Sequence, residues 1–153
     1  MENRKPALMV AALENGTVID HIPSDKVFDV VSLLGLSHID TPITIGANLT
    51  SHKMETKGII KIADRFLTED ECRKLSVIAP NIVMNTIRDY KVADKKTIQL
   101  PDEIRGTIRC QNPKCITNHE PMTTVFDVID KQNVVLRCRY CNKDINKSDI
   151  KLI

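Results

Sequence analysis

The chain of 153 residues has no tryptophan, and aromatic residues make up only 3% of it. Proteins that bind single-stranded nucleic acid stack the bases on aromatic side chains, so this scarcity argues against that class. The formal net charge is +2, whereas a surface that neutralises a phosphate backbone is usually strongly basic. The composition therefore favours a protein without a nucleic-acid partner.

Long hydrophobic runs are also missing. No apolar run approaches the roughly 18 residues of a membrane-spanning helix, so we expect no membrane partner. A short apolar patch at 7–13 is followed by Glu14, Asn15 and Gly16 rather than by the small residues of a signal-peptide cleavage site. We therefore expect a cytoplasmic protein.

The sequence contains none of the short motifs of common catalytic sites, such as G-x-S-x-G, H-E-x-x-H or the Walker lysine motif. Asp20 and His21 are adjacent, but neighbouring side chains of a regular strand point to opposite faces of the sheet. They should therefore be unable to act together as a catalytic pair. We predict a protein without catalytic activity of its own.

The first two-thirds of the chain alternates strand and helix signals. Apolar residues recur every second residue in some segments and at i, i+3, i+4 in others. Thr68 and Glu71 have the spacing of a capping box. Helices are predicted from Ser24, as N-cap, to Gly35 and from Thr68 to Pro80. Strands are predicted at 8–13 and 17–22, joined by the Asn15-Gly16 turn, and at 42–49, 58–63 and 81–87, the last running on toward Tyr90 and Val92.

This β-α-β-β-α-β order predicts an α+β fold, a ferredoxin-like sandwich in which both helices cover one face of an antiparallel sheet. A polar segment with a proline and a glycine follows it. We place a first domain at 1–98, a linker at 99–106 and a second domain at 107–153. A domain of that size is too small to bury a good core, and such domains usually need a covalent or metal staple.

Four cysteines supply the staple. Cys110 and Cys115 form a C-x4-C loop, and Cys138 and Cys141 form a C-x2-C loop. Two such loops closing around one Zn²⁺ give a tetrahedral site with no open position, hence a structural metal. The alternatives are iron, two disulfides or four free thiols. The fifth cysteine, Cys72, is predicted to be a small core residue of the second helix.

Basic residues next to the cysteines leave a second functional class open. These residues could contact phosphates as in a zinc-ribbon nucleic-acid-binding protein. They are Arg109, Lys114, Arg137 and Arg139. The other class is a small-molecule-binding domain joined to a metal-stapled docking domain.

A series of short motifs in a fixed order favours the small-molecule-binding class over the nucleic-acid-binding class and makes it specific. They are GTVIDHIP at 16–23, ITIGANL at 43–49, GIIKI at 58–62, the capped helix ending in Ala79-Pro80, N-x-I-x-x-Y from Asn85 to Tyr90, LPDEI at 100–104 and the two cysteine pairs. In this order, over nearly the whole chain, they resemble the regulatory chain of aspartate carbamoyltransferase.

The resemblance implies a ferredoxin-like nucleotide-binding domain followed by a rubredoxin-like, all-β zinc domain that docks on the catalytic chain. Such a chain has no activity of its own. It binds CTP as inhibitor and ATP as activator at one shared site, and thereby controls pyrimidine biosynthesis. Regulatory homodimers join catalytic trimers into a dodecamer of six catalytic and six regulatory chains.

The resemblance also implies roles for individual residues. Lys57, Lys61 and Lys95 would face the triphosphate, Asp20 the ribose hydroxyls, and His21, as a secondary contact, the phosphates. The residues around the base and sugar would be Val10, Ala12, Leu13, Val18, Asn85, Ile87, Tyr90 and Val92. The zinc ligands would be Cys110, Cys115, Cys138 and Cys141. Asn112, Lys114 and Lys143, on or beside the metal loops, would contact the catalytic chain.

Overall fold

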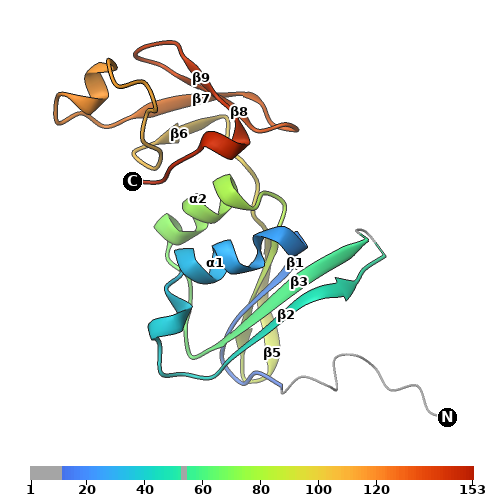
Figure 1. Cartoon of the computed structure of the whole chain (residues 1–153). Coiled ribbons are helices and arrows are strands. Elements are labelled where there is room, and N and C mark those ends of the chain that lie inside the picture. The colour runs from blue at the N-terminus through green and yellow to red at the C-terminus, as the bar shows by residue number, and fades with distance from the viewer. Residues whose placement is uncertain (1–11, 53–54) are drawn as a thin grey trace.

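The computed structural model describes residues 12–52 and 55–153. Its first domain is built on a five-stranded antiparallel sheet with the order β2-β3-β1-β4-β5 (Figure 1). The strands are β1 Gly16–Ile22, β2 Ile43–Thr50, β3 Thr56–Ala63, β4 Val83–Arg88 and β5 Lys91–Thr97. The order of the first four is that of a ferredoxin-like sheet, as predicted, and β5 extends it beside β4.

Two helices, α1 (Val27–Leu33) and α2 (Glu69–Ile78), pack on one face of this sheet. They bury apolar side chains of the central strands, and within the described residues no helix covers the other face of the sheet. The buried cluster contains Ile19, Ile22, Val27, Val30, Leu34, Leu36, Ile60, Ile62, Leu75, Ala79, Ile82, Met84 and Ile98. The predicted α+β class is confirmed.

Three of the four helix ends follow local sequence signals, including the end of α2 at Ile78, just before Pro80. Thr68 and Glu71 form the predicted capping box at the start of α2. Gly35 adopts the left-handed conformation after α1, with φ of 63°. The predicted N-cap at Ser24 is wrong: a 3-10 helix at Ser24–Lys26 precedes α1, and the Ser24 hydroxyl donates to Thr56 Oγ1 at 2.8 Å.

Two strand predictions differ from the structure. The chain does not run straight on from β4, because Asp89 and Tyr90 both have positive φ and turn it back into β5. The predicted strand at 8–13 lies mostly outside the described residues, and its described part, Ala12 and Leu13, is not in a strand.

The second domain is an all-β unit with a four-stranded sheet in the order β6-β7-β8-β9. Its strands are β6 Glu103–Arg105, β7 Val125–Asp130, β8 Val135–Cys138 and β9 Asp144–Ile145. Strand β6 lies within 99–106, the range expected to be a linker, and pairs with β7.

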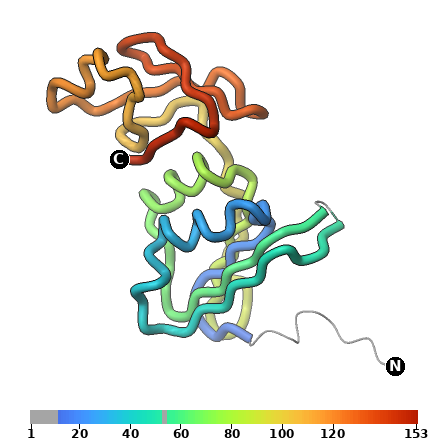
Figure 2. Tube along the Cα trace, viewed as in Figure 1, coloured from blue at the N-terminus to red at the C-terminus, as the bar shows by residue number. Residues whose placement is uncertain are grey.

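The two domains share a packed contact through α2, the helix of the first domain that lies next to the C-terminal domain in the chain trace (Figure 2). Val77 of α2 is 1% exposed and belongs to the hydrophobic cluster of the second domain, together with Leu100 and Ile104. Leu75, two residues earlier, belongs to the cluster of the first domain. One short helix therefore contributes to both cores.

Within the described part of the chain, no helix has the length and apolar character needed to cross a membrane.

Candidate ligand site and metal centre

The helix-free face of the first sheet carries a row of candidate residues brought together by strand register. Lys61 of β3 is opposite Val18 of β1, Val18 is opposite Asn85 of β4, and Asn85 is opposite Lys95 of β5. Directly paired residues of antiparallel strands point to the same face. Four residues that are up to 77 positions apart in the sequence thus form one line across the sheet.

Next to this row, strand β1 has a bulge at Asp20 and His21. The register with β3 shifts between Ile19 and Ile22, both of which are fully buried, and His21 has φ of 60°. The extra residue breaks the alternation of side chains. His21 Nδ1 consequently lies 3.7 Å from Asp20 Oδ2, and the His21 amide donates to Asp20 Oδ1 at 2.7 Å. The prediction that these two side chains point to opposite faces, which assumed a regular strand, is wrong.

The carboxylate of Asp20 is held by Lys57, whose Nζ lies 2.8 Å from Oδ1. Burial raises the pKa of Asp20, but the hydrogen bonds from Lys57 and from the His21 amide outweigh it, so the pKa lies below its usual value. His21 Nδ1 is buried and has no hydrogen-bond partner within the described residues. The bulge thus gathers an ionised carboxylate, an ammonium group and an imidazole.

The apolar candidates lie at the other end of β1. Ile87 of β4 is opposite both Gly16 of β1 and Val92 of β5. The Tyr90 amide donates to Glu14 O at 2.9 Å, which ties the segment that follows Leu13 to the β4–β5 turn. The Tyr90 side chain is 65% exposed and so is accessible to a ligand. Ala12 is exposed, and Val10 lies outside the described residues.

The four cysteines of the second domain converge. Their sulfur atoms all lie within 4.8 Å of one another, and the Cys110–Cys141 and Cys115–Cys138 sulfur pairs are each 3.7 Å apart. A tetrahedral metal with bonds of about 2.3 Å to sulfur requires sulfur separations of about 3.8 Å. All five cysteines of the chain are free thiols, so the two-disulfide alternative does not hold. The donor set fits one structural metal ion.

The protein environment alone does not favour ionisation of all four thiols. Burial is the main cause that raises the pKa of Cys110 to about 12 and also raises that of Cys138. Burial also acts on Cys141, but hydrogen bonds from the Asn112 side chain and the Lys143 amide prevail and lower its pKa to about 7. A divalent cation would allow the whole set to ionise together.

The metal loops expose both polar and apolar side chains. Asn112 Oδ1 accepts from the Lys114 amide at 3.1 Å, and the side chains of Lys114 and Lys143 are exposed. Ile116 and Tyr140, large apolar residues next to Cys115 and Cys141, are also exposed and were not predicted from the sequence. Their position in otherwise polar loops is a signal that could have identified them.

Two of the four basic residues that suggested nucleic-acid binding are engaged within the domain. Arg137 pairs with Asp144 at 2.7 Å, and Arg139 pairs with Asp127 and Glu103, each at 2.5 Å. Guanidinium groups already paired with carboxylates are poorly placed to neutralise phosphates. This geometry weakens the nucleic-acid alternative.

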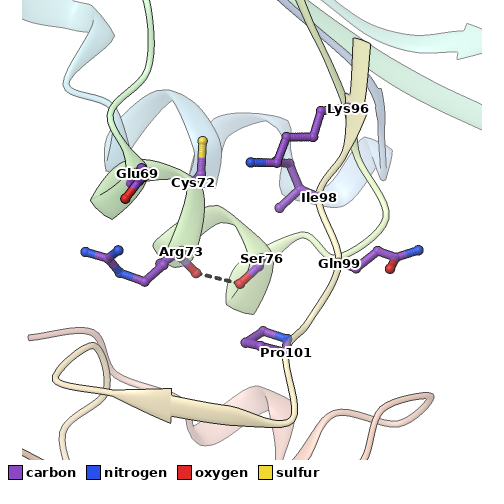
Figure 3. A pocket seen from close by; sticks show the side chains of 8 residues that line it. All are labelled: Glu69, Cys72, Arg73, Ser76, Lys96, Ile98, Gln99 and Pro101. Carbon is purple, nitrogen blue, oxygen red and sulfur yellow. Dashed lines mark hydrogen bonds between the residues drawn. The ribbon is translucent and has the colours of Figure 1, made fainter. Parts of the chain in front are cut away.

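The fifth cysteine lies elsewhere, at a small cavity of about 270 Å³ on the helical side of the first sheet (Figure 3). Lys96 of β5 extends toward Cys72 of α2 across it, and Ser76 Oγ donates to Arg73 O at 2.6 Å. Cys72 is half-buried, packs against the first core and lies 3.8 Å from Met84 Sδ. Its predicted role as a small core residue is confirmed.

The fold and these sites define a class of protein, in which a small α+β domain with a cation-lined sheet face is joined to a four-cysteine metal domain. Two family models cover nearly the whole chain. The allosteric domain of the aspartate carbamoyltransferase regulatory chain matches residues 8–99, and the metal-binding domain of the same chain matches residues 102–151. The chain belongs to the family of aspartate carbamoyltransferase regulatory chains, as the sequence motifs predicted.

Curated members of this family are similar to the chain over all or nearly all of their length. An aspartate carbamoyltransferase regulatory chain of Phocaeicola vulgatus is 60% identical over 153 residues, which are 100% of this chain and 99% of the relative. That of Bacteroides fragilis is 58% identical, with 100% of both chains covered. That of Pyrococcus abyssi is 43% identical over 145 residues, which are 94% of this chain and 95% of the relative. The similarity therefore includes both domains.

Proposed function

We propose that this chain is the non-catalytic regulatory subunit of an aspartate carbamoyltransferase and that it binds CTP as inhibitor and ATP as activator. The observation that carries the proposal is the line of Lys61, Val18, Asn85 and Lys95 across the helix-free face, next to the Asp20 bulge. A nucleoside triphosphate needs cations for its phosphates and acceptors for its ribose, and this face offers both.

Within this site, Asp20 accepts hydrogen bonds from the ribose hydroxyls, which CTP and ATP share. Lys57, Lys61 and Lys95 supply positive charge, and His21, like Lys57, lies beside Asp20. Leu13, Ile87, Tyr90 and Val92 surround the base and sugar. Backbone groups near Ala12 and Tyr90 distinguish the two bases.

The second domain docks on a catalytic chain, with zinc as its metal. A metal ion held by four thiolates has no open coordination position, which suits structural zinc. The zinc fixes the loops that carry Asn112, Lys114, Ile116, Tyr140 and Lys143. Exposed apolar residues flanked by lysines are suited to a protein partner, because each supplies buried area and the lysines add charge complementarity.

The two edges of the first sheet suggest how the chain forms a homodimer. Strand β5 is exposed along its whole length and rich in lysine, which discourages pairing with another strand. Strand β2 has no charged residue, and its Ile45 and Leu49 are exposed. We assign the β2 edge to a homodimer, the unit that links catalytic trimers in a cytoplasmic dodecamer of six catalytic and six regulatory chains.

An effector can shift such an assembly only by binding two of its global states with different affinities. In this chain, α2 packs against the sheet that carries the ligand site and inserts Val77 into the core of the metal domain. A change in the first domain therefore has a direct mechanical connection to the docking domain.

The test is reconstitution of the full chain with an aspartate carbamoyltransferase catalytic chain, followed by calorimetric titration and activity assays. We expect a stable complex, competitive binding of CTP and ATP, and opposite effects of the two on activity. A chain that forms no complex and binds neither nucleotide would refute the proposal.

A further inference from the structure

We propose that Lys57 is a positioning residue for the ribose-binding carboxylate of Asp20 and not a ligand of the triphosphate. This inference rests on the proposed nucleotide function and assigns Lys57 a different role from Lys61 and Lys95.

The two oxygens of Asp20 differ in how they are used. Oδ1 accepts from Lys57 Nζ at 2.8 Å and from the His21 amide at 2.7 Å. Oδ2 lies 3.7 Å from His21 Nδ1, too far for a hydrogen bond. Lys57 and the bulge thus fix the carboxylate in one orientation and leave Oδ2 to accept from a ribose hydroxyl.

The position of Lys57 is built into the fold. A Cβ on Gly58 would lie 2.1 Å from Val27 Cγ2, so glycine allows this part of β3 to lie directly against the start of α1. The neighbouring Thr56 is hydrogen-bonded to Ser24. These contacts hold the strand on both sides of Lys57, so that its side chain reaches Asp20 of the adjacent strand.

Moving Lys57 to a phosphate would carry a cost. The side chains of Lys57 and Asp20 are each only 22% exposed, so a separated carboxylate would be half-buried without its cation. Within the described residues, neither Lys61 nor Lys95 has a carboxylate oxygen within 4.0 Å. Those two ammonium groups are available to phosphates without breaking an ion pair.

The two roles predict different dependence on the number of phosphates. A positioning residue for the ribose contributes equally to cytidine, CMP, CDP and CTP, whereas a phosphate ligand contributes more as phosphates are added. We therefore propose titrating the full-length chain with these four compounds, by calorimetry or by NMR chemical shifts for the weak ones.

For Lys57→Gln we expect affinity for all four compounds to fall by a similar factor of about ten, the effect of one charge-assisted hydrogen bond. In an Asp20→Asn background the same change should lower affinity less than about twofold, because its effect acts through Asp20. Lys57→Arg should restore most of the affinity. Lys61→Gln should weaken CTP far more than cytidine. Lys74→Gln, which removes an ion pair with Asp70 on α2, is the matched control and should change none of the affinities.

The inference is wrong if Lys57→Gln lowers the affinity by a factor that grows from cytidine to CTP. It is also wrong if Lys57→Gln lowers the affinity by the same factor with and without Asp20→Asn. Either result would leave the nucleotide function intact. If Lys57→Arg does not restore affinity although its melting temperature matches that of the wild type, the positioning role is also wrong. If the wild-type chain and Lys74→Gln bind none of the four compounds, the proposed function itself fails.

Discussion

The contact of Val77 with the metal domain leads to a quantitative prediction. Val77→Ala removes two methyl groups from a side chain that is 1% exposed. At about 0.8 kcal/mol for each buried group, with an added cost for the cavity that remains, we expect a loss of about 2 kcal/mol in the free energy of unfolding. This energy is lost from the interface between the domains, since Val77 belongs to the core of the second domain.

The matched control is Val30→Ala on α1, which removes the same two groups from a fully buried position of the first core only. Both variants should be destabilised by about the same amount in urea titrations. Only Val77→Ala should weaken the connection between nucleotide binding and the metal domain.

The assay is the rate at which a mercurial reagent releases the metal, followed with a chromogenic chelator, with and without saturating CTP. In the wild type and in Val30→Ala, CTP should change this rate, whereas in Val77→Ala the change should be smaller. An undiminished CTP effect in Val77→Ala would show that coupling does not pass through this contact.

Four further predictions concern the metal, the ribose contact, acid and the helix anchor. Removing the metal with a mercurial reagent should unfold the second domain, since its small core cannot fold alone. The measurement is circular dichroism of a 99–153 fragment, which keeps strand β6, and a fragment that stays folded in excess chelator would contradict this. Asp20→Ala should lower the affinity for both CTP and ATP by at least about tenfold in calorimetric titrations, because both nucleotides carry the same ribose. If the affinity for only one of them falls, Asp20 has another role. The pKa of Asp20 is lowered in the fold, so its ionised form contributes stability that is fully present above about pH 4 and is lost as pH falls below it. Asp20→Asn should remove this contribution to the pH dependence of the free energy of unfolding, measured by urea titrations from about pH 3 to about pH 6. Arg65→Ala should lower the free energy of unfolding by about 2 kcal/mol, because Arg65 donates to Leu34 O at 2.7 Å and pairs with Glu71 of the capping box; a change below about 0.5 kcal/mol would show that this anchor is dispensable.

Several features were predictable because their signals are local. The capping box at Thr68 and the left-handed Gly35 depend on contacts within one turn of chain, so the sequence nearby contains all the information. The metal site could also be predicted, since each cysteine pair lies in one short loop. The only assumption was that the two loops lie close together in the fold. The local signal at Ser24 was misleading, because its hydroxyl donates to Thr56 on a distant strand instead of capping the helix.

The candidate ligand site needed more than local signals. The resemblance to the family predicted most of its residues. Composition and periodicity alone could not have predicted that Lys61, Asn85 and Lys95 lie on one line, because this depends on the register of the strands. The turn at Asp89 and Tyr90 lacks the glycine or asparagine that usually marks such turns, so the fifth strand was missed.

Periodicity, caps and ligand spacing are short-range properties, so the small α+β domain and the cysteine-stapled domain that follows it could be predicted from the amino-acid sequence alone. Three features could be seen only in the folded chain: Asp20 and His21 lie together at a bulge, Lys57 holds Asp20, and Val77 belongs to the core of the other domain. Each of these depends on contacts between segments far apart in the chain, where the energy of packing and pairing overrides the local preference of the residues involved.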